Sequence, residues 1–202
     1  VKSLFESTSD PIFLYLPDAD IIYYPQFFDK QAADIIFAEL AHEIPWQQDK
    51  IRVYGKIHPQ PRLTALFGNQ GKSYSYSNIT MQPYPWSLLL QKLKTAIEKV
   101  TDTNFTTVLL NQYRDGKDSN GWHSDNENEL GINPVIASLS FGAERMFQLK
   151  HNLDKDLKKS IVLEHGSLLL MKGTTQHFWK HQIPKTTKAV GPRINGTFRV
   201  IK

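Results

Sequence analysis

A histidine and an aspartate one residue apart, His123 and Asp125, follow a strand-like run that ends near Tyr113. In an extended segment side chains alternate between two faces, so residues two apart point the same way. These two side chains can therefore bind one cation. Because the chain contains no cysteine, a metal must have His and carboxylate ligands, which favours iron, manganese or a cysteine-free zinc site. An isolated His-x-Asp is equally typical of an ordinary polar loop, so the site needs further ligands.

The third ligand has four histidine candidates after Asp125: His151, His165, His177 and His181. We interpret the charged stretch 150–159 as a hairpin loop, and His165 precedes a turn glycine, so His151 and His165 are expected to be exposed. His177 and His181 share one face of a predicted strand at 177–183. Periodicity allows either of them. His181 is slightly favoured because it lies deeper in the strand, after Trp179.

A candidate anion-binding strand lies near the C-terminus, with polar side chains at every second position: Arg193, Asn195, Thr197 and Arg199. Two histidines and one carboxylate leave metal coordination positions open for a co-substrate and dioxygen. A planar guanidinium binds a carboxylate through two hydrogen bonds, so two arginines on one face suit a dicarboxylate such as 2-oxoglutarate. A basic edge strand is the simpler alternative, but such strands rarely carry Asn and Thr at every position between the arginines.

Residues 50–80 form a polar, aromatic and basic stretch that does not resemble a core segment. It contains Lys50, Arg52, Tyr54, Gly55, Lys56, His58, Arg62, Tyr74 and Tyr76. Cationic side chains interleaved with stacking aromatics are typical of a nucleic-acid contact surface, although a hairpin whose tyrosines pack against its own flank shows the same pattern. The net charge is +4, and residues 165–202 contain no Asp or Glu. This acid-free segment predicts a positive surface for an anionic partner, or else a solvated basic face.

Hydrophobic periodicity predicts strands at 12–16 and 21–24 and then two amphipathic helices. The first helix is expected to begin after Asp29 and to end at Pro45, and the second to be opened by Pro85. The rest of the chain is rich in short strands separated by glycines: 105–113, 135–141, 145–149, 160–163, 167–171, 177–183 and 193–201. This spacing predicts a β-sandwich or a jelly roll.

We expect a single domain over residues 1–202, in which about 1–104 form a helical and nucleotide-recognition part and about 105–202 form the jelly-roll core. No apolar run approaches the roughly 20 residues that a membrane helix needs. The first residues also lack the apolar segment of a secretory signal, so an intracellular location is expected.

Several short motifs occur in an order that resembles the AlkB-type dioxygenases, which depend on Fe(II) and 2-oxoglutarate. They are Val53-Tyr54-Gly55-Lys56, Tyr74-Ser75-Tyr76-Ser77, Asn111-x-Tyr113, His123-x-Asp125, Ile136-Ala137-Ser138-Leu139-Ser140-Phe141-Gly142, Gly166-Ser167-Leu168-Leu169, Trp179-x-His181 and Pro192-Arg193-x-Asn195-x-Thr197-Phe198-Arg199. The resemblance runs from about Arg52 to the C-terminus. It implies a mainly β (α+β) fold, with a double-stranded β-helix (jelly-roll) core, N-terminal helices and a nucleotide-recognition hairpin region.

The resemblance also implies a role for each matching residue. His123, Asp125 and His181 would bind iron as Fe(2+), with Arg199 beside them in the catalytic site. The residues that would bind 2-oxoglutarate are Asn111, Tyr113, Arg193, Asn195, Thr197 and Arg199. Tyr76 would stack on a flipped base opposite His123, and Tyr74, Asn126 and Glu127 would line the polar edge of that base. Tyr54, Gly55 and Lys56 match a hairpin finger that fills the vacated position in the duplex.

The activity that the resemblance implies is oxidative demethylation of alkylated nucleobases, such as 1-methyladenine and 3-methylcytosine, as direct-reversal DNA repair with O2 as the second co-substrate. Alternatives are a demethylase of single-stranded DNA or RNA, and a non-catalytic jelly-roll module that binds nucleic acid. A zinc hydrolase ranks last because no general base is recognisable beside the ligands. The expected partner is alkylated DNA, or RNA, bound by a monomer without membrane contact. The location would be the nucleus in a eukaryote, or the cytoplasm and nucleoid in a bacterium.

Overall fold

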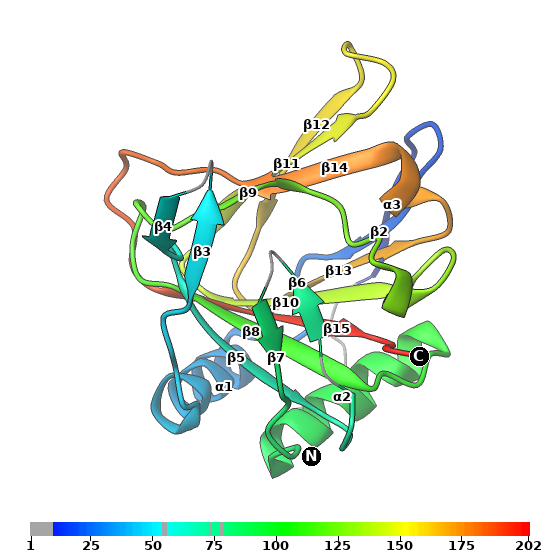
Figure 1. The fold of residues 1–202 in the computed structure, drawn as a ribbon. Coiled ribbons are helices and arrows are strands. Elements are labelled where there is room, and N and C mark those ends of the chain that lie inside the picture. Colours follow the sequence, from blue (N-terminus) through cyan, green and yellow to red (C-terminus); the bar gives the residue numbers. More distant parts are fainter. Residues whose placement is uncertain (1–9, 54–55, 73, 77–78) are drawn as a thin grey trace.

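The structure, a computed structural model, describes residues 10–53, 56–72, 74–76 and 79–202. Two antiparallel sheets face each other (Figure 1). The larger sheet has seven strands in the order β1 (Ile12–Leu14), β2 (Asp20–Tyr24), β13 (Ser167–Lys172), β10 (Ile136–Gly142), β15 (Arg193–Arg199), β8 (Thr107–Tyr113) and β5 (Leu63–Gly68). The smaller sheet has four strands in the order β12 (Lys158–Leu163), β11 (Arg145–His151), β14 (Trp179–Ile183) and β9 (Asn120–His123). The predicted jelly-roll core is confirmed.

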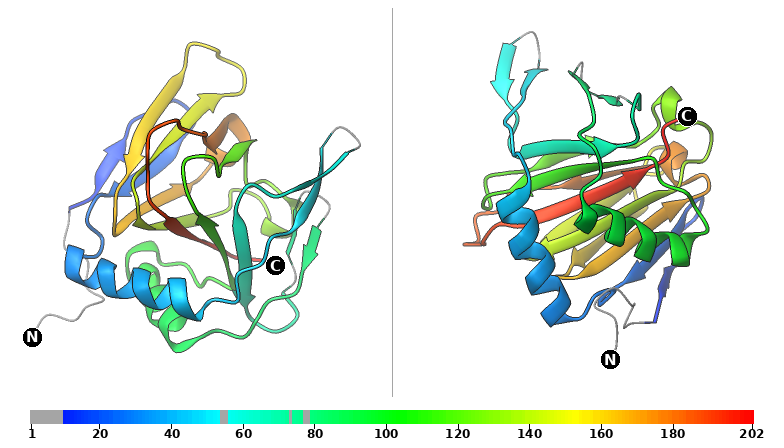
Figure 2. Two further views of the ribbon diagram at one scale, coloured as in Figure 1. Left: turned by 90° about the vertical axis from the view of Figure 1, so that its left-hand side faces the viewer. Right: turned by 90° about the horizontal axis from the view of Figure 1, so that it is seen from below.

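Two further ribbons of two strands each project from one side of this core (Figure 2, right). They pair β3 (Lys50–Val53) with β4 (Lys56–Pro59), and β6 (Tyr74–Tyr76) with β7 (Ile79–Met81). Both ribbons come from the stretch that was expected to contain recognition hairpins.

Two helices cover the outer face of the larger sheet (Figure 1). Helix α1 (Lys30–Glu43) begins after Asp29, whose carboxylate accepts a hydrogen bond from the Ala32 amide at 2.8 Å, as expected for an N-cap. Helix α2 (Leu88–Thr101) begins after Ser87, whose hydroxyl accepts a bond from the Leu90 amide. The prediction that Pro85 opens this helix is wrong, because the side chain that satisfies a free amide of the first turn belongs to Ser87.

The central strands of the larger sheet are buried on both faces, and β15 shows the consequence. Ile194 and Phe198 belong to the core under the helices. The residues between and beside them face the smaller sheet: Arg193, Asn195, Thr197 and Arg199. All seven residues of β15 are buried, because β15 lies between β10 and β8. The four polar side chains therefore belong to an interior strand, and the alternative of a basic edge strand is wrong.

The stretch 50–80 contains one core strand that the sequence analysis missed. Strand β5 is buried over Thr64–Gly68 and pairs with β8 at the end of the larger sheet. Strands β1 and β2 from the N-terminal part also join this sheet, so the expected boundary near residue 104 does not divide it. The residues of β5 are almost continuously apolar or small and nearly all buried, so the strand lacks the alternation of polar and apolar residues by which strands are recognised.

The segment 177–183 is also not a single strand. Residues Thr175–Phe178 form the short helix α3, and β14 begins only at Trp179, so His177 and His181 do not share a strand face. The expected loop 150–159 is shorter, because β11 continues to His151 and β12 begins at Lys158. His151 is buried, contrary to expectation: its ring stacks on Phe178, and its Nδ1 accepts a hydrogen bond from the Asp154 amide at 3.1 Å.

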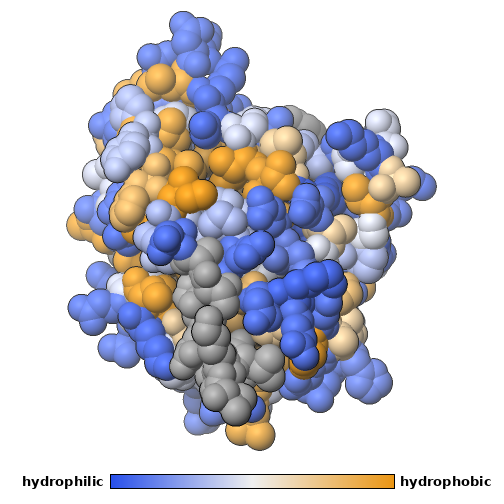
Figure 3. All heavy atoms as spheres, turned by 180° about the vertical axis from the view of Figure 1, so that it is seen from behind, coloured by the Kyte–Doolittle hydropathy of each residue, from blue (hydrophilic) through white to orange (hydrophobic). Residues whose placement is uncertain are grey.

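Seen from behind, the surface carries one short band of hydrophobic side chains and is otherwise mostly hydrophilic (Figure 3). Within the described ranges, no helix has both the length and the apolar character that crossing a membrane requires.

A 3-10 turn, η1 (Asn128–Leu130), follows the segment that carries Asp125.

Candidate metal and co-substrate site

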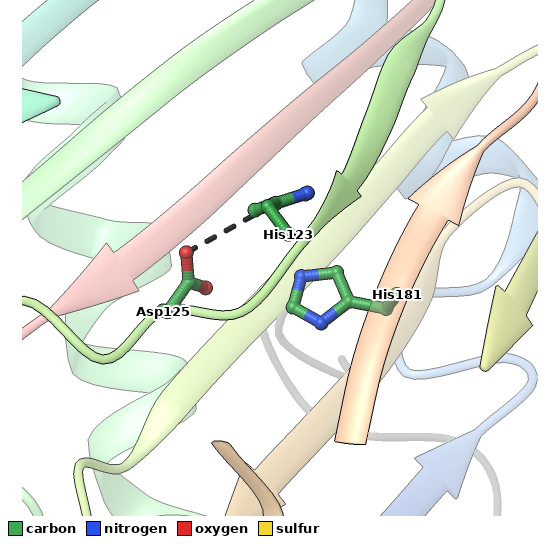
Figure 4. Close-up of side chains that lie close together, drawn as sticks. All are labelled: His123, Asp125 and His181. Carbon is green, nitrogen blue, oxygen red and sulfur yellow. Dashed lines mark ion pairs between the residues drawn. The ribbon is translucent and has the colours of Figure 1, made fainter. Parts of the chain in front are cut away.

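The three predicted metal ligands come together between the two sheets. His123 ends β9, Asp125 follows it directly, and His181 lies opposite His123 in the pairing of β14 with β9. One ligand atom from each residue lies within 4.8 Å of the other two, and His123 Nε2 is 4.0 Å from Asp125 Oδ1 (Figure 4). Adjacent strands thus bring together ligands that are 56 to 58 positions apart in the chain.

His123 is held in one tautomer. Its Nδ1 lies 2.8 Å from the carbonyl oxygen of Gly121, which can only accept a hydrogen bond, so Nδ1 carries the proton. The amide nitrogen of Asn120 lies 3.3 Å from Nε2 and donates to it. Nε2 therefore carries the lone pair that a metal ligand requires, and the Asn120 amide occupies it here.

Asp125 is buried and ionised. Burial is the largest single effect and opposes its ionisation, but the charge of Arg199, the nearby His181 and His123 and the hydrogen bond from Arg199 together outweigh it and lower the pKa of Asp125 to about 2. Arg199 Nη2 donates to Oδ1 at 3.0 Å. The backbone amide of Asp125 donates to Oε1 of Gln176 at 2.8 Å, and Gln176 is wholly buried on α3. The carboxylate is thus negative and fixed in place before any metal binds.

His181 is neutral. Its burial, together with the nearby His123, lowers its pKa to about 3, so the imidazole keeps a lone pair at neutral pH. The ring of Phe147 stacks on it with centroids 5.2 Å apart. An uncharged histidine packed against an aromatic ring is a competent metal ligand.

The co-substrate end of the cavity is built around Arg193. Burial lowers the pKa of its guanidinium to about 10, which leaves the group positively charged at neutral pH. Nη2 donates to the hydroxyl of Ser140 at 2.8 Å, and Cζ lies 5.1 Å from the ring centre of Tyr113. Nε and Nη1 are buried and find no hydrogen-bond acceptor among the described residues. A buried cation with two free donors is suited to an incoming carboxylate.

The neighbouring polar residues are fixed by the protein itself. Asn195 donates to the hydroxyl of Ser138 and to the carbonyl of Leu139, each at 2.8 Å, and accepts from Thr197 at 3.0 Å. Asn111 accepts at 2.7 Å from Nε of Arg62. These contacts orient the amides along the cavity wall.

Two buried residues of this site escaped the sequence analysis. Arg62 was expected on the nucleic-acid surface, but it is buried, lines the cavity and contacts Asn111. Gln176 supports Asp125 from a distant part of the chain. Neither residue belongs to a motif, and only the pairing of β5 with β8 or the packing of α3 reveals its role.

The expected substrate-binding residues are only partly described. Glu127 lines the cavity, whereas Asn126 is exposed and does not line it. Lys56 is exposed at the start of β4. Tyr54 and Gly55 lie outside the described residues, as do the side chains of Tyr74 and Tyr76, whose backbones form β6.

The residues present fit a divalent iron and a dicarboxylate. Two histidine nitrogens and one carboxylate oxygen are the donor set that iron(II) oxygenases use, and they leave further positions for a co-substrate and dioxygen. The free donors of Arg193 line the same cavity as these ligands. The arrangement can therefore hold a metal at one end of a dicarboxylate and bind its remote carboxylate at the other.

Comparison with known proteins agrees with this chemistry. Residues 20–199 match the family model of the 2OG-Fe(II) oxygenase superfamily. The chain is 44% identical over 190 residues to alpha-ketoglutarate-dependent dioxygenase alkB homolog 3 of Mus musculus, covering 90% of this chain and 66% of that protein. It is 38% identical over 188 residues to DNA oxidative demethylase ALKBH2 of Homo sapiens, covering 88% of this chain and 72% of that protein.

A solved structure of OsALKBH1 shares the fold, with a TM-score of 0.63, 17% identity, and coverage of 94% of this chain and 100% of that chain. The chain spans slightly less than two thirds of the length of the alkB homolog 3 proteins it matches. The family match over most of the sequence and the metal-ligand geometry lead to one conclusion: the chain belongs to the 2OG-Fe(II) oxygenase superfamily and, within it, to the AlkB homologs.

Proposed function

We propose that this protein oxidatively demethylates alkylated nucleobases of the 1-methyladenine and 3-methylcytosine type. The observation that carries the proposal is one cavity that holds both His123, Asp125 and His181 and the free donors of Arg193. The AlkB homologs that this chain resembles include proteins named as DNA oxidative demethylases.

The chain's own residues would bind and orient the metal and the co-substrate, and they would exclude water from the cavity. His123, Asp125 and His181 would hold the metal, and Arg199 keeps Asp125 ionised. Arg193 would bind the remote carboxylate of 2-oxoglutarate. Iron(II) held there would, with 2-oxoglutarate and O2, supply the oxidation of the N-methyl group, which would be lost as formaldehyde while 2-oxoglutarate becomes succinate and carbon dioxide. The target base must leave its stack to reach the cavity, at a cost of a few kcal/mol that a damaged base reduces.

A basic and aromatic face supports a phosphate-bearing substrate. On the outer face of the smaller sheet, Lys150 lies directly opposite Lys158 on one side and Lys180 on the other. Like charges opposite each other in a sheet are destabilising, so a phosphate backbone that neutralises them would relieve this repulsion. Lys150 Nζ lies 4.4 Å from the ring centre of Trp122, which is 39% exposed and immediately precedes His123. An exposed aromatic beside lysines suits a nucleic-acid strand.

The proposal extends to location and assembly. A nucleic-acid substrate implies an intracellular protein, in the nucleus of a eukaryote or the cytoplasm and nucleoid of a bacterium. We also propose that the protein acts as a monomer, because a single chain supplies the metal ligands and the carboxylate-binding arginine that the proposed activity requires. Size-exclusion chromatography with light scattering tests this point.

The direct test is incubation of an oligonucleotide containing 1-methyladenine with the protein, Fe(II) and 2-oxoglutarate, followed by mass spectrometry. We expect loss of the methyl group with the wild type and none with Asp125→Ala. Unchanged 1-methyladenine with folded, iron-loaded wild type would overturn the proposal and favour a binding module. Rates on single-stranded DNA, double-stranded DNA and single-stranded RNA distinguish a repair enzyme for duplexes from one for single strands.

A further inference from the structure

Arg145 lies outside the cavity but beside the residues that form its co-substrate end. It is the first residue of β11 and is only 4% exposed. Its guanidinium donates to three backbone carbonyls: Asp115 at 3.1 Å, Asp118 at 2.9 Å and Pro184 at 2.6 Å. One buried side chain therefore connects two loops that are distant in sequence.

These two loops join the strands that carry the site. The loop 114–119 runs from Tyr113 at the end of β8 to β9, which bears His123. The loop 184–192 runs from β14, which bears His181, to Arg193 at the start of β15. The loops also contact each other directly, because the Thr186 amide donates to the carbonyl of Gly116 at 2.8 Å. The position of Arg145 thus affects the ends of four strands.

Tyr113 connects Arg145 to the cavity. Cζ of Arg145 lies 5.7 Å from the centre of the Tyr113 ring, and Cζ of Arg193 lies 5.1 Å from the same centre. Tyr113 and Arg193 line the cavity, and Arg145 does not. Two buried guanidinium groups that share one aromatic ring concentrate positive charge at this end.

Arg145 forms no ion pair among the described residues, although the carboxylates of Asp118 and Asp115 act on its charge from a distance. The hydrogen bonds of Arg145 go to carbonyl oxygens. The carboxylate of Asp118 is bound by Arg114, from Nε at 2.8 Å and from Nη2 at 2.9 Å. In a buried environment an incompletely compensated cation acts over several ångströms. A second buried cation beside Arg193 is suited to a doubly charged ligand.

We propose that Arg145 is a positioning residue for 2-oxoglutarate. It fixes Tyr113 and the two loops, and it adds positive charge next to Arg193. This inference depends on the co-substrate of the family and not on which nucleic acid is demethylated, so it can fail or succeed independently of the proposed substrate.

The test is calorimetric titration of 2-oxoglutarate into the full chain loaded with Ni(II), which occupies the metal site without turnover. We expect Arg145→Met to raise the dissociation constant about tenfold or more. Arg145→Lys keeps the charge, but its ammonium lacks the planar guanidinium that bonds both loops. This variant should raise the dissociation constant by a smaller factor of about three. Affinity for Ni(II) itself should stay within about twofold of the wild type, because the pairing of His123 with His181 does not involve Arg145.

Arg114→Met is the matched control, because the Arg114 guanidinium binds Asp118 in the same loop, whereas the hydrogen bond to the Pro184 carbonyl and the cation–ring contact with Tyr113 are made by Arg145. It should change the affinity for 2-oxoglutarate by less than about twofold. The inference is overturned if Arg145→Met binds 2-oxoglutarate as tightly as the wild type, or if Arg114→Met weakens binding equally. If Arg145→Met does not fold, Arg145→Lys decides, and an unchanged dissociation constant for that variant overturns the inference.

Discussion

Nη2 of Arg199 lies 3.0 Å from Oδ1 of Asp125, and both side chains are almost completely buried, with 6% and 4% of their surface exposed. The pair places one positive and one negative charge together at the metal site. Asp125 is therefore ready to bind a cation, and Arg199 stabilises the carboxylate while the metal is absent.

Arg199→Met should destabilise the metal-free protein by about 3–5 kcal/mol, because it leaves a buried carboxylate without its partner. Urea unfolding in the presence of a chelator measures this loss. Arg199→Lys should recover part of it, since a Lys ammonium keeps the charge. Equal stabilities of wild type and Arg199→Met would show that the pair does not stabilise Asp125.

His181→Ala should lose bound iron, whereas His177→Ala should retain it. His181 contributes a donor to the ligand cluster, and His177 instead bonds Asn133 through Nε2 at 2.9 Å. Iron content after anaerobic loading and desalting provides the measurement. Iron that persists in His181→Ala and disappears in His177→Ala would assign the third ligand to the other histidine.

The metal-free protein should lose stability as the pH falls below about 6.5. The folded pKa of His181 is about 3, below the ordinary value of 6.5, so the unfolded chain binds the proton first. The contribution of His181 is fully present above the unfolded pKa and decreases as pH falls toward the folded pKa. The titration of His181 contributes at most about 1.4 kcal/mol per pH unit to the change of the unfolding free energy with pH.

Unfolding free energies of the wild type and His181→Gln between pH 7 and pH 4 test this dependence, because glutamine does not titrate. The slope should be smaller in the variant. Parallel slopes would mean that His181 is not the group that titrates.

Gly142→Ala should destabilise the protein by about 1–3 kcal/mol. Gly142 has φ of +86°, and an added Cβ would collide with the carbonyl oxygen of Pro192. Gly191→Ala is the control, because Gly191 lacks a positive φ and has no neighbour within 4 Å of an added Cβ. Thermal unfolding of both variants gives the comparison, and a Gly142→Ala protein as stable as Gly191→Ala would contradict the expected collision.

Lys150→Ala should weaken binding to a fluorescent single-stranded oligonucleotide and reduce its salt dependence, since one phosphate contact is lost. Trp122→Ala should weaken binding by about 1–3 kcal/mol through lost stacking. Lys99→Ala removes the same charge from α2, on the far side of the larger sheet, and should have little effect. Similar losses for Lys99→Ala and Lys150→Ala would mean that the outer face of the smaller sheet is not a specific contact surface.

The sequence by itself determined the features that depend on local periodicity. The alternation of Arg193, Asn195, Thr197 and Arg199 placed these side chains on one face of a strand, because side chains of an extended chain alternate. The cap at Asp29 defined the start of α1 for an equally local reason. The order of short motifs also indicated the family.

Only the tertiary structure decided which distant residues meet. It separated His181 from His177, which periodicity alone had not done, because α3 interrupts the predicted strand. It also brought Arg62 to Asn111, Gln176 to Asp125 and Arg145 to Tyr113. These contacts depend on strand order and on the packing of separate elements. Periodicity within one segment carries no information about them, because it reflects only the neighbours along the chain.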